Sequence, residues 1–181
     1  MKAFVYYLIL IFCAIKSYGQ DSKNKVYYYD SDSITWDNLK GTPNFSDTLQ
    51  ECFLSSTFEL KLLKVNVWTG KSTFQGYAIA FPYDSWIKEN CKNDRNHKYL
   101  QTIYDLAHLY SKRLEKQFNK KYNPAMGILE RQINEAIDKY SKDFNNEIET
   151  YNQETVYGRN ELKINEWRER IRNELKVIDK K

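Results

Sequence analysis

The stretch YLQTIYDLAHLYSKRL, residues 99–114, decides the fold of this chain of 181 residues. Its apolar residues recur at steps of three and four, a spacing that places them on one face of an α-helix. Asn93 or Asp94 can cap the start of this helix, and the pattern continues to about Tyr122. The predicted buried stripe comprises Leu100, Ile103, Ala107, Tyr110, Leu114 and Phe118.

Further helices follow the same rule of spacing. Pro124 suits the first turn of a second long helix, since a proline at that position loses no hydrogen bond, and Gly158 marks a break after it. A third long helix is predicted from about Asn160, with Ile164 and Trp167 on its apolar stripe. Ser85–Lys88 is predicted as a short helix, so all helices lie within about residues 84–178.

The part of the chain before residue 84 is typical of strands, which we expect within about residues 25–81. Residues 57–68 are rich in β-forming side chains, and residues 73–81 run back after a turn at Gly70, which predicts a hairpin. The apolar residues change face near Leu62, and this change indicates a bulge or twist. The predicted class is therefore α+β, a small antiparallel β-sheet followed by three long helices.

The first nineteen residues resemble a leader rather than part of the fold. Lys2 precedes an apolar run from Ala3 to Ile15, and Ser17 and Gly19 are the small residues that a cut before Gln20 requires. The alternative is a membrane anchor, but a span needs roughly 20 apolar residues. We therefore expect a signal peptide at residues 1–19, a single domain at residues 20–181, no membrane span after cleavage, and a periplasmic or extracellular protein.

Charge and cysteine content narrow the function further. Loss of Lys2 and Lys16 with the leader lowers the formal net charge of +4 by two, and so weak a positive charge predicts no binding of nucleic acid. Cys52 and Cys91 remain. In an exported protein they can form a disulfide, which would stabilise the fold by roughly 3–4 kcal/mol; two buried free thiols are the alternative.

Three segments taken together resemble one family. They are ITWDNLKGTP at residues 34–43, Ser85-Trp86-Ile87 with the helix of residues 99–114, and YNQETVYG at residues 151–158, followed by Trp167. Their counterparts in the family read LTWxDFKGxP, HEQGHFDIAELYARKL and YDxETxHG. The chain therefore resembles secreted bacterial proteins with a domain of unknown function, family 922, which are described as zinc-dependent proteases.

The resemblance implies that the zinc chemistry of the family is missing here. In H-E-x-x-H, two histidines one helical turn apart bind zinc and the glutamate acts as general base. The two histidine positions fall on Tyr99 and Ile103, the glutamate position on Leu100, and the third ligand position on Tyr157. The surrounding framework persists at Gln101, Asp105, Thr155 and Gly158. Intact members imply a zinc cofactor, whereas we expect none in this chain.

Other registers and other chemistry do not restore a site. The chain has only two histidines; His97 and His108 would lie about 16 Å apart along a helix, too far to share an ion that binds nitrogen at about 2.0–2.1 Å. The chain lacks the G-x-S-x-G element of serine hydrolases. Cys91 with His97 is a poor nucleophile pair, because six residues around a helix start rarely align the two groups.

We therefore expect an apolar plug in which Tyr99, Ile103 and Tyr157 lie near one another. The predicted function is that of a zinc-metalloprotease-like pseudoenzyme, which binds an unknown protein or peptide partner without cutting it. The alternatives are a structural envelope protein that pairs with a partner through its helices, and a hydrolase of non-zinc mechanism. Aromatic residues such as Trp68 and Tyr83 are candidates for a binding surface or for ordinary packing.

Overall fold

A computed structural model describes residues 27–28, 33–66, 68–69, 71–120 and 126–179 of the chain, and the expected leader lies outside them. Strands come first and helices after, which confirms the predicted α+β class. One sheet has the order β1-β4-β3, and a separate ribbon joins β2 to β5. The strands are β1 (Tyr27–Tyr28), β2 (Cys52–Phe53), β3 (Ser56–Val65), β4 (Ser72–Ala80) and β5 (Trp86–Ile87).

The predicted hairpin is present as β3 and β4. The two strands pair antiparallel from Ser56 opposite Ala80 to Val65 opposite Ser72. Their register shifts between Leu62 and Lys64, which confirms the irregularity expected from the change of phase near Leu62. An extra residue on one strand turns every later side chain to the other face, so the apolar pattern of the sequence recorded the bulge.

The short helix predicted at Ser85–Lys88 is wrong. Trp86 and Ile87 form strand β5 instead, pairing antiparallel with Phe53 and Cys52. Both residues of β5 are buried, and an aromatic and a β-branched side chain suit a strand better than one helical turn. Single 3₁₀ turns flank the strand at η3 (Pro82–Asp84) and η4 (Glu89–Cys91). A third turn, η2 (Trp36–Asn38), follows the extended backbone at Thr35.

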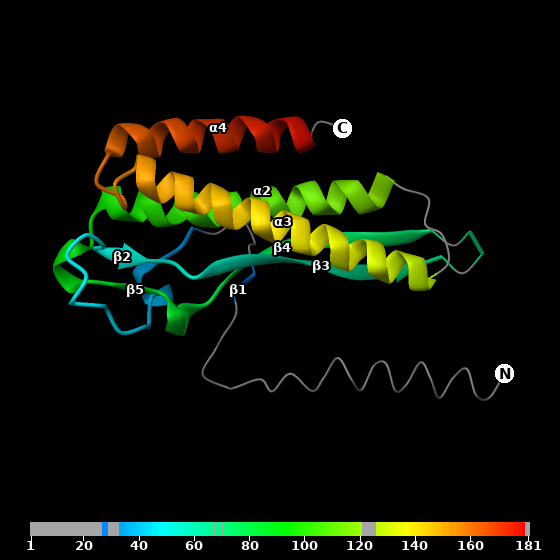
Figure 1. Cartoon of the computed structure of the whole chain (residues 1–181), viewed down its shortest axis with the longest axis horizontal. Helices are drawn as coiled ribbons and strands as arrows, with labels where there is room; N and C mark the ends of the chain where they lie inside the picture. Colours follow the sequence, from blue (N-terminus) through cyan, green and yellow to red (C-terminus); the bar gives the residue numbers. More distant parts are fainter. Residues whose placement is uncertain (1–26, 29–32, 67, 70, 121–125, 180–181) are drawn as a thin grey trace.

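The three predicted long helices are α2 (Asp94–Lys120), α3 (Met126–Glu154) and α4 (Glu161–Asp179). Asn93 caps α2, because its Oδ1 accepts a hydrogen bond from the Asn96 backbone N–H at 2.9 Å. Helix α2 lies between the main sheet and α4, and α3 crosses beside it (Figure 1). The whole stripe predicted for α2 is buried. Within the described residues, no helix is long and apolar enough to cross a membrane.

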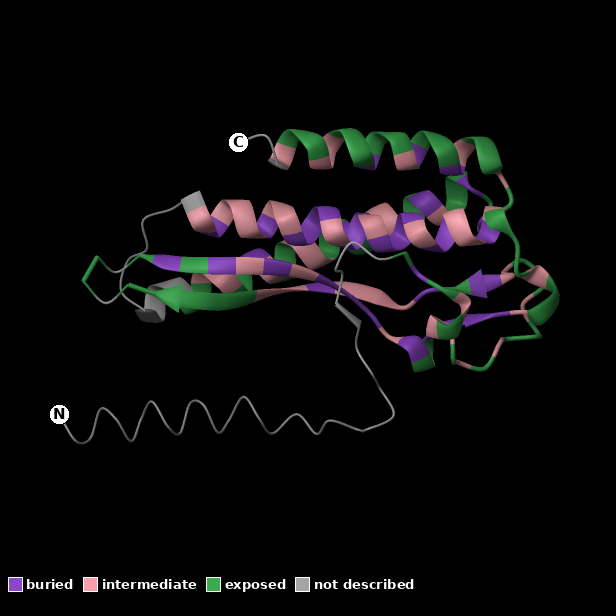
Figure 2. Ribbon diagram, turned by 180° about the vertical axis from the view of Figure 1, so that it is seen from behind, coloured by how far each residue is buried: buried purple, intermediate pink, exposed green. Residues whose placement is uncertain are grey.

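Helix α2 packs very closely against β4. A Cβ atom at Gly76 would come within 2.2 Å of the Ser111 carbonyl oxygen, so only glycine fits there. Asn119 satisfies the backbone hydrogen bonds of β4 at Phe74. Its side chain accepts a hydrogen bond from the Phe74 N–H and donates one to the Phe74 carbonyl, both at 2.8 Å. A helix side chain thus takes the place of a neighbouring strand along this edge. Figure 2 shows β4 largely buried and the outer half of β3 exposed.

Candidate functional site

The first turns of α2 hold the three positions at which the resemblance places the zinc ligands and the base. Leu100 is completely buried, and Tyr99 and Ile103 are each 3% exposed. All three belong to the main hydrophobic core. Hydrocarbon and one phenol therefore occupy the positions where the family's pattern has two imidazoles and a carboxylate.

The turn between α3 and α4 carries the third motif and has an unusual backbone. Three successive residues, Val156, Tyr157 and Gly158, have φ of 51°, 52° and 90°. Such values are ordinary for glycine but costly for a β-branched residue such as valine. Thr155, just before the turn, is fully buried, and its hydroxyl donates a hydrogen bond to the Tyr151 carbonyl at 2.6 Å.

The helix and the turn meet at Tyr99. A Cβ atom at Gly158 would lie 2.9 Å from Cγ of Tyr99, so the phenol ring rests directly on the glycine. The Tyr99 hydroxyl donates to Asn152 Oδ1 at 2.6 Å, and its ring stacks on Tyr151 with centroids 5.3 Å apart. Two motifs more than fifty residues apart in sequence therefore form one contact.

Burial of the Tyr99 side chain in this contact affects its ionisation. It raises the pKa of the Tyr99 phenol, and the nearby ionisable groups Cys52, Tyr151 and Tyr157 raise it further. The phenol consequently stays protonated and serves as a hydrogen-bond donor. We call Tyr99, Leu100, Ile103 and Tyr151 the plug. Tyr157, which was also expected there, is half-buried in the α3–α4 turn next to Gly158, and its nearness to Ile103 stays a prediction.

The framework residues Gln101 and Asp105 lie on another side of α2, where they hold the first motif. The Ile34 N–H donates to Gln101 Oε1 at 2.8 Å, and the Ile34 carbonyl lies 2.6 Å from His97 Nε2. Gln101 in turn donates to Asp105 Oδ1 at 2.7 Å. Burial raises the pKa of the Asp105 carboxyl, against the opposing effect of the Gln101 hydrogen bond and of Arg168. Gln101 and Asp105 thus act as supports for an extended segment.

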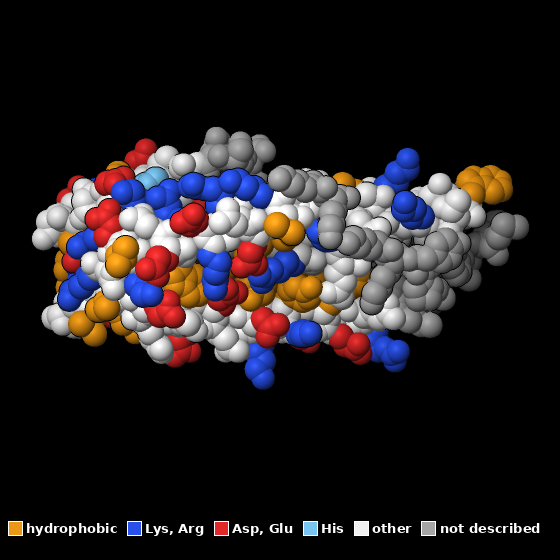
Figure 3. Space-filling model, turned by 90° about the horizontal axis from the view of Figure 1, so that it is seen from above, with side chains coloured by type: hydrophobic (Ala, Val, Ile, Leu, Met, Phe, Trp, Pro, Cys, Tyr) orange, Lys and Arg blue, Asp and Glu red, His pale blue; other side chains and the backbone are white. Residues whose placement is uncertain are grey.

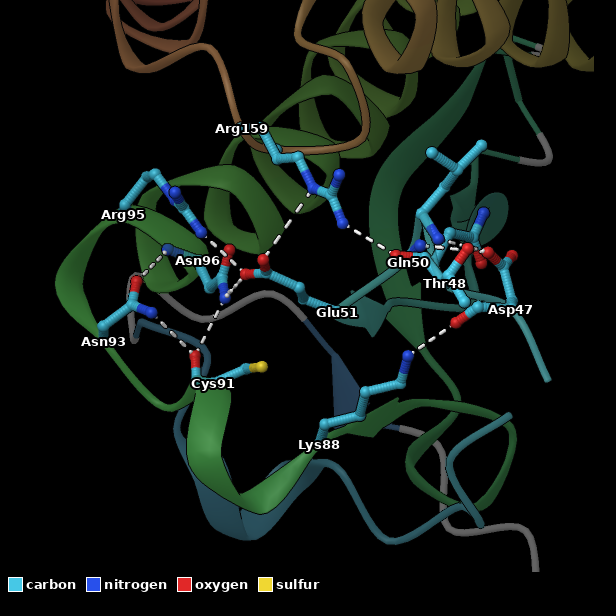
Figure 4. Close-up of polar contacts among 12 residues, drawn as sticks. Asp47, Thr48, Gln50, Glu51, Lys88, Cys91, Asn93, Arg95, Asn96 and Arg159 are labelled. Carbon is cyan, nitrogen blue, oxygen red and sulfur yellow. Dashed lines mark hydrogen bonds and ion pairs between the residues drawn. The ribbon is translucent and has the colours of Figure 1, made fainter. Parts of the chain in front are cut away.

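A polar network, which the sequence did not reveal, joins the start of α2 to the α3–α4 turn. Glu51 lies at its centre (Figure 4): its Oε2 accepts from Arg95 at 2.6 Å and from Asn96 at 2.8 Å, and Arg159 Nε lies 3.8 Å from its Oε1. Arg159 also donates to the Thr48 carbonyl at 2.7 Å. The hydrogen bond from Asn96, helped by Arg95, lowers the pKa of Glu51. The Glu51 carboxylate is ionised and bound by several donors. It therefore links segments of the chain and is a poor general base.

Cys52 and Cys91, the candidate disulfide, are both free thiols in the structure. Cys52 is buried in the core, and Cys91 is half-buried against the same core cluster. Burial raises the pKa of the Cys52 thiol to about 12, with Glu51 and Cys91 adding to the effect. Cys52 is therefore a protonated thiol at neutral pH, which makes it a poor nucleophile.

Contacts between aromatic rings connect the plug to a groove. Trp167 packs edge-on against Tyr151 at 5.2 Å and donates its indole N–H to Glu154 Oε2 at 2.8 Å. On its other side Trp167 lines a groove of about 310 Å³ between α3 and α4. The remaining lining residues are Glu147, Thr150, Glu154, Glu166 and Arg170.

No three His, Cys, Asp or Glu side chains gather as a metal site in the part of the chain that the structure describes. The plug offers no ligand for zinc apart from two protonated phenols. It therefore fits packing and hydrogen bonding.

Comparisons with known proteins add no neighbour to this geometry. No protein-family model, no curated protein and no solved structure was found to match the chain. The assignment of a function therefore depends on the contacts described above.

Proposed function

We propose that this protein is an exported, non-catalytic protein of metalloprotease-like design, which binds a protein or peptide partner. The observation that carries the proposal is the contact of Tyr99 with Gly158. It joins the two segments that the resemblance assigns to a zinc site, and it fills the space between them with an aromatic ring. This arrangement favours a non-catalytic protein in which the positions of the zinc site now form part of the hydrophobic core.

The energetics of the plug favour this interpretation. Buried imidazoles and carboxylates without a metal would be costly. Burial of Leu100 and Ile103 in their place contributes about 1.5–3 kcal/mol each. The replacements thus convert positions that would depend on a metal into positions that stabilise the fold by themselves, and they leave no acid–base pair within the plug.

The groove between α3 and α4 is the surface that best suits a partner. Three glutamates, Glu147, Glu154 and Glu166, line it with the single cation Arg170. Glu147 is paired with Arg170 and Glu166 with Lys163, while Glu154 is bound by the neutral indole N–H of Trp167. The Arg170 guanidinium lies 3.8 Å from the centre of the Trp167 ring and covers it. Glu154 is the groove carboxylate held by a neutral donor, so it favours a partner that inserts a lysine or arginine side chain.

The test is recovery of a partner from the cell envelope, with the exported protein as bait. Glu154→Gln with Glu166→Gln removes two charges of the groove, and Glu149→Gln with Glu169→Gln removes two exposed charges outside it. We expect the first pair to lose the partner and the second pair to keep it, in a salt-dependent manner. Equal recovery of the partner by both double variants would contradict binding of the partner in the groove.

A peptidase screen with and without a chelator accompanies this experiment. We expect no cleavage in either condition. Cleavage that a chelator abolishes would overturn the non-catalytic assignment, and cleavage that a chelator leaves unchanged would favour a hydrolase of another mechanism.

One observation favours a second function, pairing with a structural partner through the helices. A shallow groove of about 470 Å³ lies at the other end of α4, and Val177 in its lining is 61% exposed. Val177→Glu should weaken a helical partner and leave the glutamate groove intact. Loss of the recovered partner in this variant alone would support the structural function.

A further inference from the structure

The far end of the β3–β4 hairpin carries an unusual group of exposed apolar residues. Trp68, in the connecting turn, is 94% exposed, the highest value among the exposed large hydrophobic residues in the described part of the chain. Behind it on β3, Leu62, Leu63 and Val65 are each at least 39% exposed. Tryptophan is normally well buried in a soluble fold, so an exposed indole on the same hairpin as three exposed aliphatic side chains indicates an interaction surface.

Hydrogen bonds of Asn66 support the backbone at Trp68 and Thr69. Asn66 Oδ1 accepts from the backbone N–H groups of Trp68 and Thr69 at 3.0 and 3.1 Å. The Asn66 N–H donates to the Lys71 carbonyl at 2.8 Å and closes the turn. The backbone N–H groups of Trp68 and Thr69 are therefore bound to Asn66 before any partner binds, which lowers the entropic cost of binding.

The charge of the hairpin end is entirely positive. Residues 60–75, LKLLKVNVWTGKSTFQ, contain three lysines and no aspartate or glutamate. Lys64 and Lys71 on either side of the turn are exposed. The view from above shows hydrophobic and basic side chains together at this end of the molecule (Figure 3). On the same face, away from this end, Lys and Arg side chains lie among Asp and Glu side chains.

We propose that the hairpin end docks on an anionic lipid surface, with Trp68 at the level of the headgroups. An indole has an apolar body and one N–H donor, a combination that is enriched at membrane–water interfaces. Leu62, Leu63 and Val65 lie on the hairpin behind it, and Lys64 and Lys71 meet the headgroup phosphates. This anchor would hold an exported protein at a membrane without a spanning helix, and it is separate from the glutamate groove of α3 and α4.

The experiment measures binding of the exported chain to vesicles of phosphatidylcholine and phosphatidylglycerol in equal parts. The N-terminus is established by mass spectrometry, and every variant is compared in the same background, so that the apolar run Ala3–Ile15 cannot account for a difference. We expect Trp68→Ala to weaken binding about tenfold or more. Lys64→Gln with Lys71→Gln should weaken it about 25-fold, close to fivefold per lysine.

The matched controls are Tyr83→Ala, an exposed aromatic residue on η3, and Lys139→Gln with Lys142→Gln on α3. Both should bind like the unmodified protein. Lipids with bromine on the acyl chain should quench fluorescence in the unmodified protein and in Tyr83→Ala, and this quenching should be lost in Trp68→Phe.

Equal binding by the Trp68 and control variants would overturn the proposal. So would absence of vesicle binding, including the case in which Trp68 instead mediates binding to a soluble oligosaccharide or a protein.

Discussion

The two ends of helix α2 are used in opposite ways. At its start, Tyr99, Leu100 and Ile103 are buried in the core, and Gly158 of the α3–α4 turn lies against the Tyr99 ring. At its end, Asn119 supports β4, but the hairpin beyond it carries exposed apolar side chains. The polar groups that the resemblance leads one to expect at the start are replaced by buried hydrocarbon. The comparison teaches that the helix which resembles a catalytic one is the structural centre of the fold, and that the surfaces proposed for binding lie elsewhere.

The largest expected effect comes from a matched pair of leucines at the two ends. Leu100→Ala should lower the free energy of unfolding by about 2–5 kcal/mol, because it opens a cavity in the core. Leu63→Ala, at an exposed position, should change it by less than about 0.5 kcal/mol. Urea denaturation measures both. Similar effects at the two positions would break the comparison between a closed plug and an open hairpin end.

Gly158→Ala tests the contact that closes the plug. The new methyl group would meet the Tyr99 ring at a backbone φ of 90°, so we expect a loss of about 1–3 kcal/mol. Adding Tyr99→Leu should make part of that loss non-additive, because the ring no longer obstructs the methyl group. Thermal unfolding of the two single variants and the double variant measures the coupling, and strict additivity would argue against the contact.

Val156→Asn should have the opposite sign. Valine at φ 51° is strained, whereas asparagine tolerates the left-handed region, so a gain of about 1 kcal/mol is expected. The side chain is 48% exposed, and little burial is lost with it. A decrease in the melting temperature would show that Val156 contributes packing that the strain does not cancel.

The smallest predicted effect depends on pH. Burial raises the pKa of Asp105 in the folded state, so the folded chain binds its proton more tightly than the unfolded chain. Its contribution to stability is greatest below the ordinary pKa of aspartate and is lost as pH rises through the raised value. Asp105→Asn should therefore be more stable than the unmodified protein at neutral pH, and this advantage should disappear in acid. Unfolding at several pH values measures it, and a constant difference would contradict it.

Periodic features of the fold were predictable from sequence. The stripe on α2 repeats over many turns, so its burial and the helix could be inferred together. The bulge near Leu62 was predictable for the same reason, because a one-residue shift reverses the faces of a strand.

Features that depend on tertiary contacts were not predictable. Trp86 and Ile87 form a strand because Cys52 and Phe53 lie beside them, and a two-residue strand has no period. The Glu51 network joins residues that are far apart in sequence. Arg159 directly follows the Gly158 of the third motif, and this adjacency was the only local signal of the network.

Zinc content tests the central claim most directly. The protein is purified from zinc-supplemented growth, its metal is measured by mass spectrometry, and its melting temperature is recorded with zinc and with a chelator. We predict far less than one zinc per chain and the same melting temperature in both conditions, because the plug holds Tyr99, Leu100 and Ile103 without a metal. One zinc per chain, with a melting temperature that the chelator lowers, would contradict this account.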